Sequence, residues 1–288
     1  MTSEALDDDV VGVTPKVVGI VTHPLRHDAA TIAAELEARL GEAGVETRRW
    51  RDGDDIAAFN DGLDLAVSLG GDGTMLRTVD LVFASGAAVL GVHVGHLGYL
   101  TEAEPDDIEE VLGRLLDGDF HVTERMLLQV VVESSGSARG RWSALNEAVI
   151  EKLAPGGTVR LGVDINGTFF TTYAADGVIV ATPTGSTAYS FSARGPIVSP
   201  RHRCLLLTPV SPHMLFDRSL VLDPEEELAF DVRAPQRAAL TIDGVKTGEL
   251  ECGDVVRCTA GPRPARIVTF GPRDFHQILK AKFGLADR

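Results

Sequence analysis

The chain has 288 residues, enough for two domains with their own cores, and its 44% hydrophobic and 24% charged content is typical of globular proteins. Its formal net charge of −15 argues against nucleic acid or anionic lipid as a partner, and its five lysines among 27 basic residues favour a halophilic source. No leader-like segment, membrane-length apolar run or metal-type cysteine spacing is found, so we expect a cytoplasmic protein.

The first half of the chain alternates strand-like and helix-like segments. After residues 1–14, which we expect to form a disordered acidic tail, apolar and β-branched runs predict strands at 16–22, 45–49, 63–69 and 87–93. Helical spacing of apolar residues predicts helices at 28–43, 74–84 and 105–116. This alternation favours right-handed βαβ units in a doubly wound α/β domain with a mostly parallel sheet. Ligands of such sheets bind beyond the carboxyl ends of the strands.

From about residue 121 the pattern predicts a β-rich, sandwich-like second domain, because long helical periods are lacking. The strand-like segments are 127–133, 141–153, 158–165, 168–173, 177–182, 204–208, 219–221, 227–233, 238–242, 255–259 and 266–270. An amphipathic segment at 274–283 predicts a last helix that returns to the first domain. The expected domains are therefore 15–120 with 271–288, and 121–270.

The turn at 69–77 joins an expected strand to an expected helix, where unpaired backbone amides and the helix dipole attract anions. It predicts a site for the phosphates of a donor. The residues expected to bind them are Gly70, Gly71, Gly73, Thr74 and Arg77. Asp72 would be repelled by such anions unless it holds a metal or accepts a proton from an attacking hydroxyl, so it is the candidate catalytic residue. The alternative is a tight turn in which Asp72 caps the helix.

Two polar segments in the second half suit a polar ligand. Asp176 opens an apolar strand that runs into residues 183–192, which are rich in hydroxyls and small side chains. Asn146-Glu147 lies in another apolar strand and suits an adenine edge and ribose hydroxyls. The alternatives are a Ser/Thr-rich capping loop and a strand end or bulge. His213 is interpreted as a loop histidine rather than a metal ligand, and Asp243-Gly244 as a hairpin turn.

In their order and amino-acid sequence these motifs resemble those of the NAD kinase family, and the resemblance covers about residues 16–283. The matching segments are 70–74, 95–99, 146–147, 176–189 and 208–213. The resemblance, closest to archaeal halophile-like members, implies an α/β domain plus a β domain in a homodimer or homotetramer. It also implies transfer of a phosphoryl group from ATP or polyphosphate to the 2′-hydroxyl of the adenosine ribose of NAD, with Asp72 as general base. Magnesium would be held mainly by phosphates. The residues expected to bind NAD are Gly73, Tyr99, Asn146, Glu147, Asp176, Thr184, Thr187, Ala188, Tyr189, Ser192, Ser211 and His213.

Some positions depart from this resemblance. Arg194 stands where many members have glycine, His93-Val94 replaces a common Asn-Thr, and Tyr99 replaces phenylalanine. The choice between ATP and polyphosphate, and between NAD and NADH, stays open. Lipid or sugar kinases share Gly-Gly-Asp-Gly, but lipid kinases of that type place Asn-Glu a few residues later, unlike 146–147 here. A non-catalytic dinucleotide sensor would have no use for Asp72 beside phosphates.

Overall fold

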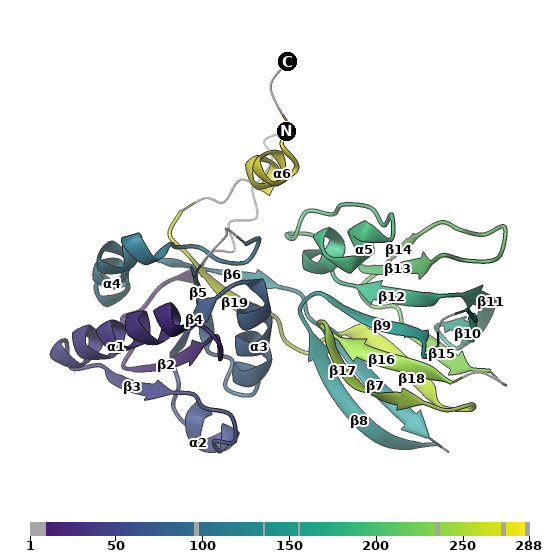
Figure 1. Ribbon diagram of the computed structural model, residues 1–288, viewed down its shortest axis with the longest axis horizontal. Coiled ribbons are helices and arrows are strands. Elements are labelled where there is room, and N and C mark those ends of the chain that lie inside the picture. The colour runs from purple at the N-terminus through teal and green to yellow at the C-terminus, as the bar shows by residue number, and fades with distance from the viewer. Residues whose placement is uncertain are drawn as a thin grey trace. The chain divides into compact units, whose positions relative to one another are not determined.

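The computed structural model describes residues 10–94, 98–134, 136–154, 156–233, 237–271 and 275–285 (Figure 1). The chain forms two compact units, one from Met1–Glu124 with Ala265–Arg288 and one from Arg125–Pro264. Unit 1 is α/β and unit 2 is β-rich, which confirms the predicted fold class. None of the helices in the described ranges is long and apolar enough to cross a membrane.

Unit 1 is built on a seven-stranded sheet in the order β1-β6-β19-β5-β4-β2-β3. Its elements are β1 (Val10–Val11), β2 (Val17–Thr22), α1 (His27–Glu42), β3 (Glu46–Arg49), α2 (Ile56–Asn60), β4 (Leu65–Gly70), α3 (Asp72–Val82), β5 (Ala88–His93), the 3-10 helix η1 (Pro105–Asp107), α4 (Ile108–Asp117), β6 (His121–Arg125), β19 (Ala265–Thr269) and α6 (Phe275–Phe283). Strands β3, β2, β4, β5 and β19 are successively parallel. Every residue of β4 and β5 is buried, as their continuous apolar runs predict for central parallel strands.

The N-terminal prediction needs a correction. Val10 and Val11 pair with β6, and beyond them Gly12 donates its amide hydrogen to the Phe120 carbonyl oxygen at 2.7 Å. The hydroxyl of Thr14 donates to the Leu116 carbonyl oxygen at 2.8 Å. Residues 10–14 are therefore held against the sheet instead of forming a tail, because β-branched residues suit an edge strand. Residues 1–9 lie outside the described residues.

Two strands that fall in the expected second domain belong to the sheet of unit 1. Strand β19 was predicted as a strand of that domain, whereas β6 was not predicted as a strand. Strand propensity is local and does not say which strand is the partner. Helix α2 was not predicted, and it starts where the Asp55 carboxylate accepts the Ala57 amide hydrogen at 2.9 Å.

Unit 2 contains two six-stranded antiparallel sheets in the orders β11-β10-β15-β18-β7-β8 and β14-β13-β12-β9-β16-β17. The first holds β7 (Leu128–Ser134), β8 (Ser137–Ala144), β10 (Val159–Ile165), β11 (Thr168–Ala175), β15 (Leu228–Val232) and β18 (Val255–Ala260). The second holds β9 (Glu147–Lys152), β12 (Gly177–Ala181), β13 (Leu205–Val210), β14 (Leu220–Leu222), β16 (Ala238–Ile242) and β17 (Val245–Leu250). Buried residues of both sheets, including Leu161, Phe230, Val180 and Leu240, form one core, so the unit is a β-sandwich.

The single strand predicted at 141–153 is two strands, β8 and β9, which lie in different sheets. The chain changes sheet at residues 145–146, where the backbone amides bond to a side chain instead of continuing a ladder. Strand β17 and the short helices η2 (Thr184–Thr187) and α5 (Tyr189–Ser192) were not predicted.

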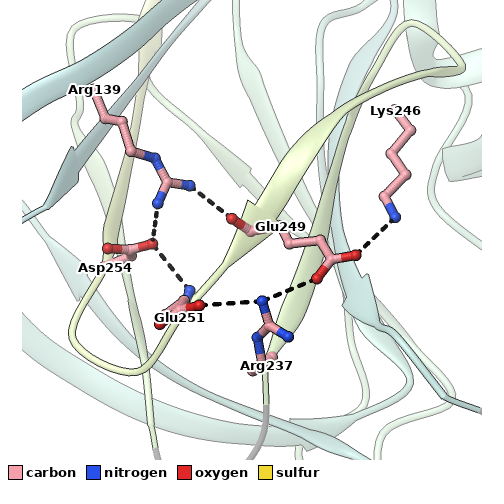
Figure 2. Close-up of polar contacts among 6 residues, drawn as sticks. All are labelled: Arg139, Arg237, Lys246, Glu249, Glu251 and Asp254. Atoms are coloured by element: carbon pink, nitrogen blue, oxygen red, sulfur yellow. Dashed lines mark hydrogen bonds and ion pairs between the residues drawn. The ribbon is translucent and has the colours of Figure 1, made fainter.

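A polar network joins the edge strands β8 and β17 of the two sheets (Figure 2). Arg139 of β8 donates to the Asp254 carboxylate at 2.9 Å and to the Glu249 carbonyl oxygen at 2.7 Å. The Asp254 side chain is only 4% exposed, so its charge depends on these partners. Arg237 lies 3.1 Å from the carboxylates of both Glu249 and Glu251. The network comprises Arg139, Arg237, Lys246, Glu249, Glu251 and Asp254.

Candidate functional site

Asp72 is the first residue of α3, and it follows Gly70, the last residue of β4, and Gly71, the N-cap of the helix. Its Oδ2 accepts the Tyr99 amide hydrogen at 2.9 Å and its Oδ1 accepts the Leu100 amide hydrogen at 3.0 Å. The N-cap residue of α3 is Gly71, which has no side-chain cap, so the helix-cap alternative is wrong. A carboxylate can accept about four hydrogen bonds, and Asp72 is only half-buried, so capacity for a further donor remains.

Gly98 makes this arrangement possible. A Cβ atom at Gly98 would lie 2.1 Å from Oδ1 of Asp72, closer than non-bonded atoms approach. The segment after β5 can therefore lie against the carboxylate only because residue 98 has no side chain. Sequence reasoning placed Gly98 in a motif but did not connect it with Asp72. The preceding residues Gly95, His96 and Leu97 of that motif lie outside the described residues.

A cavity of about 510 Å³ lies beyond the carboxyl ends of β2, β4 and β5, where a parallel sheet binds its ligands. The described residues that line it are His23, Pro24, Arg26, Gly71, Gly73, Thr74, Arg77, His93 and Val94. A Cβ atom at Gly71 or Gly73 would meet no atom within 4 Å, so the backbone at these positions is open to a ligand. In the described part of the chain, no acceptor is bonded to the amides of Asp72 and Gly73, and such first-turn amides attract anions.

Two residues of the glycine turn face elsewhere. Gly70 is not among the lining residues, and a Cβ there would lie 2.2 Å from Oγ1 of Thr74, so Gly70 makes room for that side chain. Asp72 is also outside the lining, because its carboxylate turns to the amides of residues 99 and 100. The turn therefore presents its amides to the cavity and its carboxylate to the neighbouring segment.

Tyr99 lies beside Asp72 and contacts the last helix. Burial, followed by the negative charge of Asp72, raises the pKa of the Tyr99 phenol. The Lys282 ammonium of α6 lies 5.2 Å from the centre of the Tyr99 ring, within the range of a cation–π contact. Lys282 was not singled out from the sequence, since one lysine in an amphipathic helix carries no signal of its own.

In unit 2, Glu147 opens β9 and is 6% exposed. Burial raises its pKa to about 8, the charge of Asp243 adds to this rise, and a hydrogen bond from the Tyr189 backbone amide lowers it. Its Oε2 is buried, and no partner for it lies in the described ranges. A buried carboxyl oxygen of this kind suits a hydrogen bond to a ligand. Asn146 lies beside it and is half-buried.

Asp243 holds this segment in place. Its carboxylate accepts amide hydrogens from Leu145 at 2.7 Å, Asn146 at 2.8 Å and Glu147 at 3.0 Å. Asp243 and Gly244 have φ angles of 47° and 80°, which fits the predicted hairpin turn between β16 and β17. The Asp-Gly pair indicates the turn, but nothing local indicates that the carboxylate binds three distant amides.

The hydroxyl-rich loop packs against the same segment. The Thr182 hydroxyl donates to the Leu145 carbonyl oxygen at 2.5 Å and accepts the Gly185 amide hydrogen at 3.1 Å. A Cβ at Gly185 would lie 2.1 Å from the Asn146 carbonyl oxygen, so the two backbones touch. The predicted NAD-binding residues of the loop differ in burial. Thr184 is buried, Thr187 and Ala188 are half-buried, and Tyr189 and Ser192 are exposed.

Asp176 lies between β11 and β12, and the Lys152 ammonium is 2.6 Å from its Oδ1. Burial, and then the charges of Glu151, Asp176 and Glu147, raise the pKa of Tyr189. The Tyr189 phenol is therefore close enough to Asp176 and Glu147 to feel the charge of both. Sequence analysis did not identify Lys152 as the partner of Asp176.

Ser211 and His213 follow β13, which pairs with β12, and both are exposed. Ser211 has a φ angle of 45°, and the His213 amide donates to the Ala174 carbonyl oxygen at 2.7 Å. The described residues contain no group of three or more His, Cys, Asp or Glu side chains that could hold a metal ion.

Comparison with known proteins finds matches over most of the chain. Residues 49–120 match the family described as ATP-NAD kinase N-terminal domain, and residues 145–270 match the ATP-NAD kinase C-terminal domain. The NAD kinase of Moorella thermoacetica is 42% identical over 75% of this chain and 70% of its own length. The NAD kinase of Syntrophotalea carbinolica is 35% identical over 95% of this chain and 100% of its own length.

Two solved structures share the fold at 24% sequence identity. Yeast NADH kinase complexed with NADH has a TM-score of 0.88 and covers 96% of this chain and 89% of its own. An NAD kinase from Archaeoglobus fulgidus in complex with ATP has a TM-score of 0.74 and covers 94% of this chain and 100% of its own.

Proposed function

The chain belongs to the NAD kinase family, whose members phosphorylate NAD to NADP, and we propose that Asp72 is the general base of this reaction. The observation that carries the proposal is the orientation of Asp72. Its carboxylate is held by two backbone amides at one side of a turn whose own amides line an anion-attracting cavity. Neither a helix cap nor a plain turn requires that arrangement.

The donor site is assigned to the cavity of unit 1. The amides of the glycine turn and the Arg77 guanidinium bind the phosphates, as helix N-termini and arginines do elsewhere. ATP is the donor that the family description and the Archaeoglobus complex favour, and polyphosphate shares the same phosphate chain. The donor binds as its magnesium complex, because Mg²⁺ is commonly held by phosphates and water with few protein ligands.

Asp72 orients the 2′-hydroxyl of the adenosine ribose and accepts its proton as the new bond forms. The bond between the 2′-oxygen and phosphorus forms while the bond from that phosphorus to the leaving phosphate oxygen breaks. NADP and the shortened donor are the products, and the proton rests on the Asp72 carboxylate until solvent removes it. The two amides that bond Asp72 fix its position without using all of its acceptor capacity.

Unit 2 is assigned the recognition of NAD. Asn146 and Glu147 present an amide and a carboxyl oxygen to the adenosine, and burial keeps Glu147 largely protonated near neutral pH. Asp176 and the hydroxyl-rich loop bind the rest of the dinucleotide, and NAD binding is also assigned to Tyr99 and Gly73. Ser211 and His213 serve a neighbouring subunit's site in a homodimer or homotetramer. The cytoplasm and a salt-rich interior are the setting that the composition favours.

Direct assay of the purified protein tests this function. NAD or NADH is incubated with ATP or polyphosphate, with and without magnesium, at low and high salt, and NADP(H) is measured with an NADP-specific dehydrogenase. NADP formation that needs both a donor and magnesium is expected. Phosphorylation of diacylglycerol in place of NAD would indicate a lipid kinase, and NAD binding without turnover would indicate a sensor.

A further inference from the structure

His93 is the last residue of β5 and lines the cavity of unit 1. It is 4% exposed, and neither Nδ1 nor Nε2 has a hydrogen-bond partner in the described part of the chain. Leaving both nitrogens of a buried imidazole unsatisfied is unfavourable, so such a group is expected to meet a ligand. We propose that His93 is a donor-binding residue whose imidazole hydrogen-bonds a phosphate oxygen of the phosphoryl donor. This inference rests on the proposed function.

The position of His93 places it beside the glycine turn. His93 and Gly70 are register partners in the parallel pair β4–β5, and the Val94 amide donates to the Gly70 carbonyl oxygen at 3.1 Å. The cavity is therefore lined by Gly71 and Gly73 of the glycine turn and by His93 at the end of β5. An anion bound at the glycine turn has His93 as a neighbour.

The charges around the cavity favour a chain of phosphates over a neutral ligand. Arg26, Arg77 and His23 line it together with His93, and its described lining contains no carboxylate. Arg77 also pairs with Asp52, and Arg26 lies 3.7 Å from the Asp28 carboxylate, but neither carboxylate is among the lining residues, so the lining itself carries cationic and proton-donating groups. Arg26 is oriented by a hydrogen bond to the Val94 carbonyl oxygen. The cavity volume of about 510 Å³ lies within the range of small-molecule sites, roughly 300–1,000 Å³.

ATP and inorganic polyphosphate both contain this phosphate chain, so the test uses both. His93→Phe removes the ring nitrogens at similar volume, and His93→Gln keeps an N–H donor. For His93→Phe we expect the KM for ATP and the Kd for inorganic tripolyphosphate, measured by calorimetry without NAD, to rise about tenfold, as for loss of a charge-assisted hydrogen bond. The KM for NAD should stay within about twofold, and His93→Gln should recover most of the donor affinity.

The melting temperature separates this role from a structural one. His93→Phe should melt at or above the wild-type temperature, because an apolar ring removes two unsatisfied buried atoms. His202→Gln, an exposed histidine in unit 2, is the control and should change neither affinity. Unchanged tripolyphosphate affinity in folded His93→Phe overturns the proposal, even if ATP kinetics change. If the wild type makes no NADP, the proposed function fails, but tripolyphosphate binding still decides the role of His93.

Discussion

Replacement of Gly98 by alanine should displace the catalytic carboxylate. The added Cβ would lie 2.1 Å from Oδ1 and 2.8 Å from Cγ of Asp72, so the carboxylate must leave the amides of Tyr99 and Leu100. Two hydrogen bonds to a charged acceptor contribute about 1.5–3 kcal/mol each. The lower entropy of the unfolded alanine chain offsets about 0.4–1 kcal/mol. We expect the free energy of unfolding to fall by about 2–5 kcal/mol.

The same substitution should lower kcat for NADP formation by about 10²-fold or more, the contribution of a positioned general base. Urea unfolding and initial-rate kinetics measure the two effects. Gly113→Ala is the matched control, because Gly113 lies within α4 and a Cβ there meets no atom within 4 Å. It should stabilise the protein by about 0.5–1 kcal/mol and leave kcat unchanged. Wild-type stability and kcat in Gly98→Ala would refute the reasoning.

Three further substitutions test other parts of the structure. Burial raises the pKa of Glu147 from 4.5 to about 8, so the native state holds a proton that the unfolded chain has lost, and stability should fall as pH rises across this range. Glu147→Gln should flatten that fall in melting temperature between pH 5 and 9, and an unchanged slope would contradict the assignment. Arg139→Met should cost about 2–4 kcal/mol in urea unfolding, because the buried Asp254 carboxylate loses its ion-pair partner. Arg237→Met should cost about 1 kcal/mol at most, because Arg237 is exposed, and equal losses would contradict the role given to the burial of Asp254. Arg194 has a φ angle of 67°, which costs a non-glycine residue about 1–2 kcal/mol, so Arg194→Gly should raise the melting temperature by a few degrees, and a decrease would argue against strain there.

Much of the fold follows from local patterns. The runs that became β4 and β5 are apolar at nearly every position, which is the pattern of a strand buried on both faces. The buried residues Ala29, Ala33, Leu36 and Leu40 follow the helical period and give α1. Strand partners could not be predicted in this way, since β6 and β19 have the same strand propensity as the strands of unit 2.

In the candidate site too, some residues could be predicted from sequence and others could not. The glycine turn and the hydroxyl-rich loop were found from residue types alone, because backbone amides and hydroxyls form hydrogen bonds wherever they are exposed to a ligand. The residues that orient these segments were not identified in that role. Gly98 positions Asp72, Asp243 holds the amides of residues 145–147, and Lys152 pairs with Asp176, each across a long stretch of sequence. Such contacts depend on the tertiary fold, so no local pattern reveals them.

Asp72→Asn, assayed for conversion of NAD to NADP, tests the central claim most directly. Asparagine keeps the size of aspartate but offers one acceptor oxygen to the two amides of residues 99 and 100, so a stability loss of about 1–2 kcal/mol is expected. The account predicts that kcat falls at least about 10²-fold in the folded variant, while ATP and NAD still bind. A kcat within about threefold of wild type would contradict Asp72 as the general base.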